Sequence, residues 1–429
     1  MTYEEAKKYL EDCNQYAGEL TLEPLKEILN RLGNPQDKLS FVHIAGTNGK
    51  GSVLAYISTV LKEAGYRVGR YISPTIFSYR ERIQVNEEYI SRADLIRLTE
   101  QIRKVGDRML SEGLSHPTMF EAETALAFLY FAEQKCDLVV LETGMGGRMD
   151  ATNVIQNTVA AVLASISMDH MGFLGNTLSE IAANKAGIIK PGCTVVTMKQ
   201  EPEAERAVQK QAEACGCPVV VSDPEQALNR KRGLFSQTFD YGKRKEVEIS
   251  LSGEYQFANG ALALEVIDVL KEKGYKIPEE ALRNGLRKTV WTGRFSVIAK
   301  EPYVIADGAH NRDAAKKLAR TIEKYLPDKR LIYIMGVLAD KEYDVVIEKT
   351  AAYASEIITV MTPDNVRALS AEDLARAVAV HNPHVQAAGS IKAAVDRAYE
   401  LAGKEDVILA FGSLSYLGEL VREVQTRMP

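Results

Sequence analysis

A short glycine-rich stretch near the N-terminus combines the residue types that bind phosphate. Residues 43–53 read HIAGTNGKGSV, with Gly46, Gly49 and Gly51 placed around Lys50. Glycine adopts backbone angles that other residues avoid, so successive N–H groups can turn toward one anion. A helix that begins after such a loop adds the positive end of its dipole, and the lysine adds a mobile charge. The stretch therefore predicts binding of a nucleotide phosphate.

The spacing of this loop departs from the common pattern G-x-x-x-x-G-K-[ST]. Ile44 stands where the first glycine of that pattern belongs, and Gly51 separates the lysine from Ser52. A plain glycine turn between a strand and a helix is the alternative. Phosphate binding is favoured because an apolar strand, the loop, the lysine and a helical pattern occur together.

A second candidate follows an apolar run further along the chain. Residues 137–144 read DLVVLETG, so Glu142 lies at the end of a predicted buried strand. Nucleotide enzymes hold Mg²⁺ on an acidic residue at such a strand end, downstream of the phosphate loop. A surface glutamate at a strand end is the alternative, and this residue alone does not decide between the two.

The elements that must position these residues alternate between short apolar runs and helical patterns. Strands are predicted at 41–45, 137–144, 159–167 and 194–198, with helices between them that include 52–64 and 121–134. Runs of β-branched residues separated by helices indicate a parallel sheet that is covered on both faces. We predict an α/β fold in which residues 1–296 form a P-loop-type ATP-binding domain with a mostly parallel sheet.

The pattern changes in the second half of the chain. Alternating apolar residues around a charged turn predict a hairpin at 233–251, followed by helices near 258–273 and 278–288. Beyond 290–298, which contains the only tryptophan, four strand ends run into turn residues and helices: YVIADGAHN, RLIYIMGV, EIITVMTP and DVILAFGSLSY. This predicts a smaller Rossmann-like α/β domain at 297–429. Ligands of such sheets bind outside the carboxyl ends of the strands, so we expect the active site between the two domains if those ends face the first domain.

Composition excludes several classes of protein. The chain has 429 residues, 46% hydrophobic and 26% charged, which is ordinary for a globular protein of two or three domains. A net charge of −5 gives no reason to expect nucleic acid, and no apolar run is long enough to cross a bilayer. The five cysteines include no C-x-x-C pair, so reduced thiols are expected rather than a zinc or redox site. We expect a cytoplasmic, monomeric enzyme without a signal peptide, a membrane partner or a nucleic-acid partner.

Seven motifs occur in order along the chain and together resemble one family. They are GTNGKGS, YISP, LETGMGGRMDATN, SMDH, NKAGIIKPG, GRF and DGAHN. The ordered set resembles folylpolyglutamate synthase, including bifunctional relatives with dihydrofolate synthase activity, within the Mur ligase superfamily. The resemblance covers essentially the whole chain, and the family's phosphate loop has the same extra glycine after its lysine.

The resemblance implies an ATP-dependent acid–amino-acid ligase that uses ATP and Mg²⁺. It also implies that residues 1–296 are a Mur-ligase-like ATP-binding and folate-binding domain and that residues 297–429 are a glutamate-ligase domain. A carboxylate of folate or dihydropteroate would attack the γ-phosphate of ATP and become an acyl phosphate. The amino group of L-glutamate would then attack that carbonyl, so that phosphate leaves and an amide remains. Phosphorylation supplies the leaving group that a carboxylate lacks, and both charge-rich steps need cations and exclusion of water.

The resemblance also implies roles for individual residues. Nucleotide binding is expected of Gly46, Thr47, Asn48, Gly49, Lys50, Gly51, Ser52, Asn259, Arg294 and Asp307. Catalytic roles are expected of Lys50, His170, Lys185 and His310, and metal binding of Ser73, Glu142 and His170. Substrate binding is expected of Thr118, Met119, Phe120, Glu121, Met149, Asp150, Ala151, Arg80 and Arg82. Lys185 matches the lysine that CO₂ carbamylates in this family.

Several of these residues also have ordinary structural interpretations. His170 could be a core or capping histidine, and His310 could mark the entry to a helix. Lys185 could extend along a solvated edge. Asn259 could cap a helix, and a phenylalanine at a helix start, such as Phe120, is more often part of the core.

Two other functions are open to a sequence with a phosphate loop. Another Mur-type ligase would join an amino acid to a cell-wall precursor, but the loop begins at Gly46, which leaves no room for an extra uridine-nucleotide domain before it. A nucleotide-switch protein without ligase chemistry would have no use for the set Ser73, Glu142, His170 and Lys185.

Overall fold

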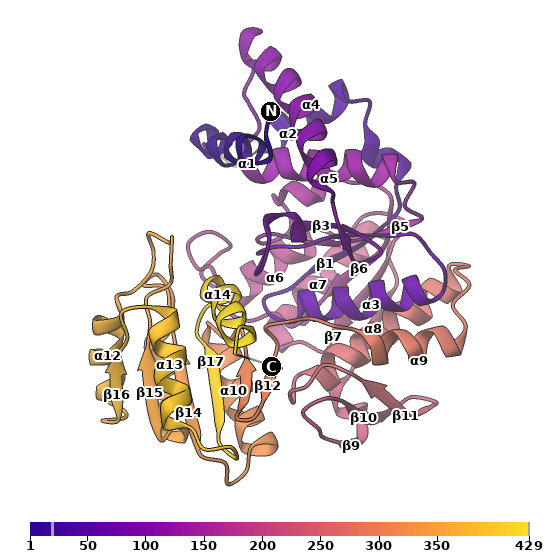
Figure 1. Cartoon of the computed structure of the whole chain (residues 1–429). Helices are drawn as coiled ribbons and strands as arrows, with labels where there is room; N and C mark the ends of the chain where they lie inside the picture. The colour runs from indigo at the N-terminus through magenta and orange to yellow at the C-terminus, as the bar shows by residue number, and fades with distance from the viewer. Residues whose placement is uncertain (19–20, 428–429) are drawn as a thin grey trace. The chain divides into compact units, whose positions relative to one another are not determined.

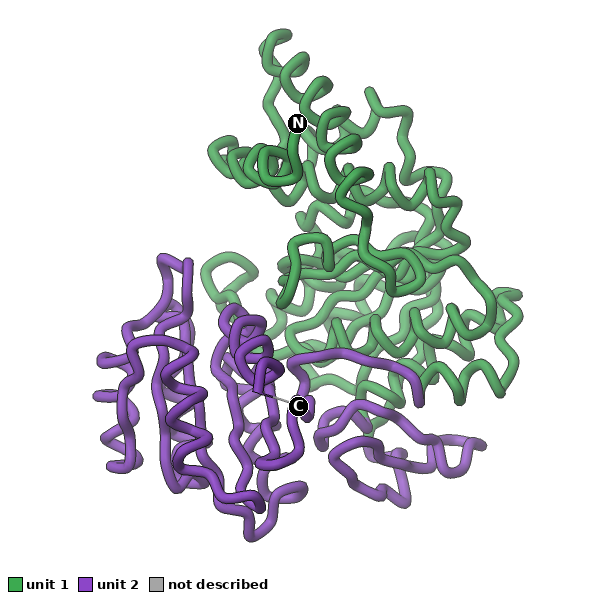
Figure 2. The backbone as a smooth tube through the Cα atoms, viewed as in Figure 1, with its two compact units in different colours: residues 1–224, 258–286 green, residues 225–257, 287–429 purple. Residues whose placement is uncertain are grey.

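The structure is a computed structural model that describes residues 1–18 and 21–427. The chain divides into two compact units, and each is made of two separate stretches of chain (Figure 2). Unit 1 comprises residues 1–224 and 258–286, and unit 2 comprises residues 225–257 and 287–429. The sequence predicts one boundary between two functional domains, after residue 296. The division into compact units does not test this boundary, which stays a prediction.

Eight strands form the central sheet of unit 1, in the order β4-β3-β2-β5-β1-β6-β7-β8 (Figure 1). Their bounds are β1 Phe41–Ala45, β2 Val68–Tyr71, β3 Ile83–Val85, β4 Glu88–Tyr89, β5 Leu138–Glu142, β6 Thr158–Leu163, β7 Thr194–Met198 and β8 Val219–Ser222. The strands from β2 to β8 in this order run parallel, and β3 and β4 add an antiparallel edge. Every residue of β1, β5 and β7 is buried, as expected for strands covered on both faces. The predicted α/β class with a mostly parallel sheet is confirmed.

Helices cover both faces of this sheet. They are α1 Tyr3–Asp12, α2 Glu23–Arg31, α3 Lys50–Glu63, α4 Arg92–Ser111, α5 Met119–Glu133, α6 Leu178–Ala186, α7 Pro202–Cys215, α8 Gln256–Glu272 and α9 Glu279–Lys288. On one face Leu10, Ile28, Leu98 and Phe128, from α1, α2, α4 and α5, pack in one buried cluster with Leu141 of β5. Helices α6 and α7 bury a second cluster against β6 and β7. The other face carries α3, with α8 and α9 beside it (Figure 1).

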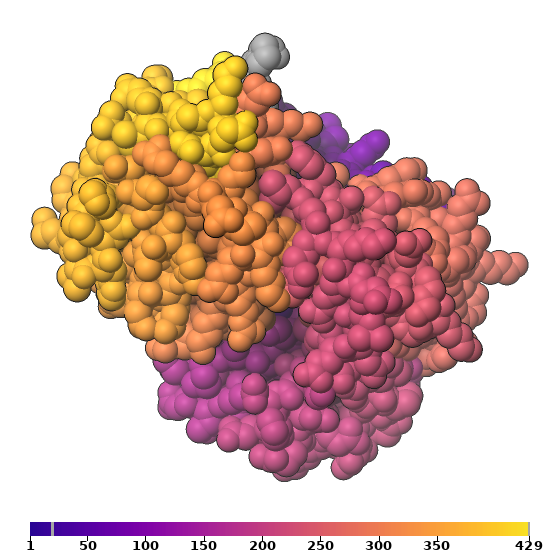
Figure 3. All heavy atoms as spheres, turned by 90° about the horizontal axis from the view of Figure 1, so that it is seen from below, coloured from indigo at the N-terminus to yellow at the C-terminus, as the bar shows by residue number. Residues whose placement is uncertain are grey.

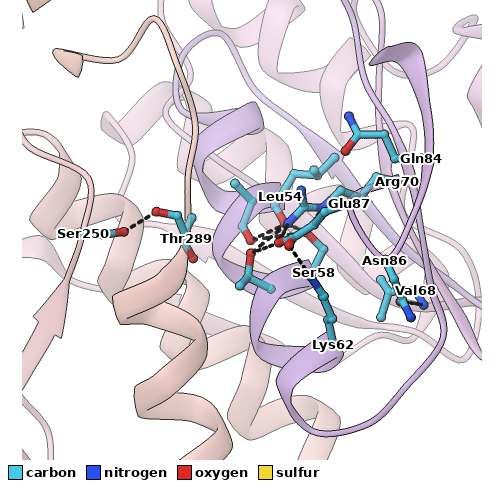
Figure 4. Close-up of polar contacts among 12 residues, drawn as sticks. Leu54, Ser58, Lys62, Val68, Arg70, Gln84, Asn86, Glu87, Ser250 and Thr289 are labelled. Carbon is cyan, nitrogen blue, oxygen red and sulfur yellow. Dashed lines mark hydrogen bonds and ion pairs between the residues drawn. The ribbon is translucent and has the colours of Figure 1, made fainter. Parts of the chain in front are cut away.

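A buried arginine ties α3 to the sheet. Arg70 of β2 is 4% exposed, and its guanidinium donates to Ser58 Oγ at 2.5 Å and Thr59 Oγ1 at 2.8 Å, both on α3 (Figure 4). It also donates to Glu87 Oε1, in the β3–β4 turn, at 2.7 Å, while Lys62 donates to the other carboxylate oxygen at 2.6 Å. Burial lowers the pKa of Arg70 to about 10, and Glu87 opposes this shift. The network holds the helix that begins at the glycine loop against β2.

Unit 2 contains a six-stranded sheet in the order β12-β13-β17-β14-β15-β16. Its elements are β12 Ser296–Lys300, β13 Tyr303–Ala306, α10 Arg312–Tyr325, β14 Leu331–Met335, α11 Tyr343–Thr350, β15 Glu356–Thr359, α12 Ala371–Ala379, β16 Val385–Ala387, α13 Ile391–Leu401, β17 Val407–Phe411 and α14 Leu414–Gln425. Only the edge strand β12 is antiparallel among the described strands of this sheet. The four predicted strands are confirmed as β13, β14, β15 and β17. Helix α14 packs against β12 and β13, and its yellow surface adjoins orange residues of the same unit in Figure 3.

A small antiparallel sheet, in the order β11-β10-β9, precedes α8. The hairpin predicted at 233–251 is confirmed as β10 Gln237–Tyr241 and β11 Arg244–Ile249, and β9 Leu228–Lys231 adds a strand that was not predicted. The strand predicted at 159–167 is too long, because β6 ends at Leu163. The residues that follow β6 use backbone groups to bind the glycine loop instead of continuing the sheet.

The five cysteines are free thiols, and Cys193 Sγ lies 3.7 Å from Cys217 Sγ. No helix within the described part of the chain is both long enough and apolar enough to span a membrane.

Candidate active site

Several predicted site residues of unit 1 lie at one edge of the central sheet. Strands β2, β5, β1 and β6 are adjacent and parallel, so their carboxyl ends meet at that edge. Ser73 follows β2, Glu142 ends β5, the glycine loop follows β1, and His170 follows β6. The register pairs Ile44 with Glu142, which brings the acidic residue level with the start of the loop.

The glycine loop connects β1 directly to α3. Gly49 is the N-cap of α3 with φ 93°, and a Cβ there would lie 2.6 Å from Oδ1 of Asn259. A Cβ on Gly46 would also clash, since it would lie 2.8 Å from Cβ of Ala164, the residue that follows β6. Gly51 and Ser52 are buried in the first turn of α3. Asn259 is the fourth residue of α8, so it contacts the loop rather than capping its own helix.

Hydrogen bonds fix the loop to the segment after β6. The amides of Thr47 and Asn48 both donate to the carbonyl of Ser165, at 2.7 and 3.2 Å. Thr47 Oγ1 donates to the carbonyl of Ser167 at 2.9 Å and accepts from its amide at 3.0 Å. The loop is therefore held by two neighbouring strands.

Two lysines converge on one carbonyl of the loop. Lys50 Nζ donates to Gly46 O at 3.2 Å, and Lys185 Nζ, from α6, donates to the same oxygen at 3.0 Å. Lys50 also lies 3.9 Å from Glu142 Oε1, whereas no carboxylate of the described chain lies within 4.0 Å of Lys185 Nζ. Burial, and after it the charge of Lys50, lowers the pKa of Lys185 to about 7. Lys185 is only 3% exposed, which excludes a lysine on a solvated edge.

His170 lies in the turn that follows β6. Its φ is 51°, its side chain is 40% exposed, and Nε2 lies 3.9 Å from Asp169 Oδ1. Thr177 caps α6, so His170 is neither a helix cap nor a core residue. Within the described residues, no group of three or more His, Cys, Asp or Glu side chains could hold a metal ion. The set Ser73, Glu142 and His170 therefore stays a prediction.

The TMFE and MDA segments, which are separate in sequence, lie together. Phe120 at the start of α5 and Asp150 in the loop after β5 both contact Gly144. A Cβ on Gly144 would lie 2.6 Å from the Phe120 ring and 3.3 Å from Asp150 Oδ2. Phe120 is half-buried, with its ring centroid 5.8 Å from that of Tyr71. An aromatic face beside a carboxylate suits a flat ring that carries hydrogen-bond donors.

The two predicted substrate arginines have different surroundings. Arg82 forms an ion pair with Glu123 at 3.3 Å, and its guanidinium carbon lies 5.8 Å from the centroid of the Phe120 ring. Arg80 donates to the carbonyl of Ile90 at 2.9 Å. The structure thus brings Arg82 to Phe120, and an internal carboxylate already balances its charge.

Two of the other predicted substrate residues cap a helix, and the remaining three differ in how deeply they are buried. Thr118 and Glu121 form the capping box of α5, so the Glu121 carboxylate binds the helix start. Met119 is half-buried, Ala151 is buried, and Met149 is 40% exposed.

In unit 2, Asp307 and Arg294 lie at the carboxyl end of β13. Asp307 is 3% exposed, and its Oδ2 accepts from Tyr255 Oη at 2.7 Å and from the amide of Phe295 at 2.9 Å. Burial raises the pKa of Asp307, although the Tyr255 hydrogen bond and the charge of Arg294 oppose the shift. Arg294 lies so close to Gly308 that a Cβ there would meet its guanidinium at 2.3 Å.

His310 follows in the same turn. Its Nδ1 is 2.8 Å from the carbonyl of Gly308, which can only accept, so Nδ1 carries the proton and Nε2 is the acceptor in the neutral ring. Asn311 caps α10 by accepting from the amide of Ala314, so the capping role does not belong to His310.

Two residues that support the site are not among those predicted from the sequence. Asp169, inside the SMDH motif, accepts from the amide of His170 at 2.8 Å, and its position in the motif was a usable signal. Tyr255 bonds Asp307 across 52 residues of sequence, and no local pattern could predict that contact.

Known proteins resemble this chain over most of its length. The Mur ligase middle domain matches residues 44–267, and the Mur ligase, glutamate ligase domain matches residues 293–414. A dihydrofolate synthase/folylpolyglutamate synthase from Bacillus subtilis (strain 168) is 35% identical over 432 residues, which cover 99% of each protein. The structure of Mycobacterium tuberculosis folylpolyglutamate synthase complexed with ADP has a TM-score of 0.90 and 28% identity, covering 100% of this chain and 99% of that one. An FPGS–AMPPCP–folate complex has a TM-score of 0.84 and 30% identity, covering 99% and 100%.

Proposed function

Because the chain belongs to the folylpolyglutamate synthase/dihydrofolate synthase family of Mur ligases, we propose that it is an ATP-dependent ligase that adds L-glutamate to folates. A folate carboxylate attacks the γ-phosphate of ATP, giving ADP and an acyl phosphate. The amino group of L-glutamate then attacks the acyl carbon, and phosphate leaves as the amide forms. The convergence of Lys50 and Lys185 on the Gly46 carbonyl, beside Glu142, is the observation that carries the proposal.

We assign nucleotide contacts to the glycine loop, Lys50, Asn259, Arg294 and Asp307. The amides of residues 46–52 and the ammonium of Lys50 bind the β- and γ-phosphates, where a fixed charge stabilises the transferring phosphoryl group. Asn259 lies against the same loop and contacts the nucleotide. In unit 2, Arg294 and Asp307 bind the nucleotide, and His310 binds the nucleotide or the incoming glutamate.

Mg²⁺ would be held by Ser73, Glu142 and His170. Two of these donors are oxygens, which Mg²⁺ prefers, and Glu142 is a buried carboxylate at the strand edge that carries the phosphate loop. When bound, the ion neutralises charge on the phosphates. A carbamate on Lys185 would add a second anion at this edge.

We extend the substrate to dihydropteroate. The aromatic ring of Phe120 and the carboxylate of Asp150 meet at Gly144, which supports a binding site for a pterin ring. The cytoplasmic location and the monomeric state stay predictions from the sequence.

Release of ADP from the purified enzyme tests the proposal. ADP should form only when a pterin and L-glutamate are both present, and mass analysis should find a product with one more glutamyl group. Dihydropteroate and tetrahydrofolate are supplied in turn to determine which pterin is accepted. ADP release without either substrate would favour a nucleotide switch. A requirement for a uridine-linked cell-wall precursor would favour another Mur-type ligase.

A further inference from the structure

A buried histidine lies on the strand that leads into the phosphate loop. His43, at the centre of β1, is 0% exposed, and its Nε2 lies 2.8 Å from Oγ1 of Thr152. Its Nδ1 is buried without a hydrogen-bond partner in the described part of the chain. Burial, helped by the charge of Lys190, lowers the pKa of His43 to about 3, so the ring is neutral.

The direction of each hydrogen bond follows from the chemistry of its partners. Asp150 Oδ1 accepts from the amide of Thr152 at 3.0 Å and lies 2.5 Å from its hydroxyl oxygen. Burial raises the pKa of Asp150, and the hydrogen bonds that it receives from Thr152, Met145 and Gly144 oppose this shift by favouring the carboxylate. A carboxylate only accepts, so with Asp150 ionised the single hydroxyl proton of Thr152 points at it. Thr152 Oγ1 must therefore accept from His43, which places the proton of the neutral ring on Nε2.

This chain of bonds ends at the wall of the predicted pterin site. Asp150 Oδ2 accepts from the amide of Met145 at 2.7 Å, so the carboxylate joins the two ends of the loop that follows β5. The same oxygen lies against Gly144, whose other neighbour is the ring of Phe120. The order of contact is His43, Thr152, Asp150, and then the loop backbone beside the aromatic ring.

Packing alone does not account for a histidine at this position. A buried acceptor without a hydrogen bond, such as Nδ1 of His43, is unfavourable. An apolar side chain of similar size would fill the same space without this cost. What His43 supplies, and an apolar residue would not, is the Nε2–H donor that orients Thr152.

We propose that His43 is a positioning residue for pterin recognition: through Thr152 and Asp150 it holds the loop that forms one wall of the pterin site. The inference rests on the proposed function, because it needs a pterin to bind beside Phe120 and Asp150. His43 acts on the pterin through these partners.

Three variants of the full-length enzyme test this role. His43→Leu removes the donor at similar volume, His43→Gln keeps an N–H donor that can reach Thr152, and Thr152→Val removes the hydroxyl at constant shape. His43→Leu and Thr152→Val should each raise the KM for the pterin about tenfold. The KM for ATP should stay within about twofold of the wild-type value, because these variants weaken the binding of the pterin and not of the nucleotide. His43→Gln should recover most of the pterin affinity.

A double variant and a spectroscopic measurement complete the test. His43→Leu combined with Thr152→Val should be no worse than Thr152→Val alone, since both act on one chain of bonds. An unchanged pterin KM in His43→Leu, additive effects in the double variant, or an equal rise in the KM for ATP would overturn the inference. ¹⁵N NMR of labelled histidine in the unmodified protein should find the Nε2–H tautomer at neutral pH, and an Nδ1–H tautomer would overturn it even if every variant unfolded. A wild-type enzyme that glutamylates neither pterin would instead contradict the proposed function.

Discussion

Replacing Lys185 tests why a lysine is buried beside the phosphate loop. We predict that Lys185 reacts with CO₂: the neutral amine forms a C–N bond to CO₂, one proton leaves, and a carbamate anion remains. Lys185→Ala should then lose most ligase activity while still binding ATP through Lys50. The anion would replace the repulsion between two ammonium groups at the Gly46 carbonyl with an attraction.

The magnitude follows from the protonation of the amine. The pKa of Lys185 is lowered from 10.5 to about 7, chiefly by burial. About half of the Lys185 amines are neutral at pH 7, against roughly one in three thousand for an ordinary lysine, so the reactive form is enriched about a thousandfold. A pKa lowered from 10.5 to about 7 means that the folded protein favours the neutral amine over the ammonium by about 5 kcal/mol more than water does.

The sign of the stability effect is also determined. The pKa of Lys185 is lower in the folded than in the unfolded chain, so the unfolded chain binds more protons between about pH 7 and 10.5. Without the carbamate, the free energy of unfolding should therefore rise with pH across this window, and the full destabilisation should be present below pH 7. Carbamylation removes the buried ammonium and should flatten this rise.

The assay uses ¹³C-labelled bicarbonate and a matched lysine. A carbamate signal should be visible by ¹³C NMR in the wild type and absent in Lys185→Ala. Activity should fall when CO₂ is removed and return when bicarbonate is added, and acetate should restore part of the activity of Lys185→Ala. Lys190, in the same motif and half-buried, gives the control, because Lys190→Ala should keep both the signal and the CO₂ dependence. Full activity of Lys185→Ala, or constant activity without CO₂ and without a carbamate signal, would refute the reasoning.

Four further predictions follow from the same contacts. Lys50→Ala should abolish ligation in a folded protein, because electrostatic contacts to a transferring phosphoryl group are worth about 3–4 kcal/mol; near-wild-type turnover at saturating ATP would contradict this. Gly49→Ala should raise the KM for ATP and lower Tm, whereas Gly65→Ala, with φ 89° and open space around it, should lower Tm alone; equal KM values for ATP in both variants would remove the argument from close approach. Glu87→Gln should lower the free energy of unfolding by about 1.5–3 kcal/mol because the buried Arg70 loses its charged hydrogen-bond partner and keeps only uncharged partners such as Ser58 and Thr59. The pKa of Glu87 is lowered, so its contribution should be present above pH 4.5 and be lost below it, and calorimetry that finds no such pH dependence would disprove the assignment. ATP analogue, folate and glutamate together should rearrange the two units about the segment around Trp291, seen in its fluorescence and in small-angle scattering; an unchanged scattering profile would count against this.

The sequence alone determined the features that depend on neighbouring residues. Residues 41–45 form a strand, the glycine loop follows, and a helix comes next, because β-branched runs, glycine and helical periodicity are local signals. The sequence predicts this helix from residue 52, and the helix begins at Lys50. The order of seven motifs identified the family for the same reason, since each motif is read within a few residues. Local patterns also predicted the strand ending at Glu142 and the four main strands of unit 2.

The tertiary structure decided which distant residues meet and how deeply they are buried. The extension of β6 leaves the sheet because its carbonyls bind Thr47 and Asn48, whereas its apolar sequence predicted a strand. The pKa of Lys185 depends on surroundings drawn from several elements, and the bond from Tyr255 to Asp307 spans 52 residues. Hydrogen-bond partners and desolvation depend on distances between atoms that are far apart along the chain, and these distances exist only once the strands are ordered in the sheet.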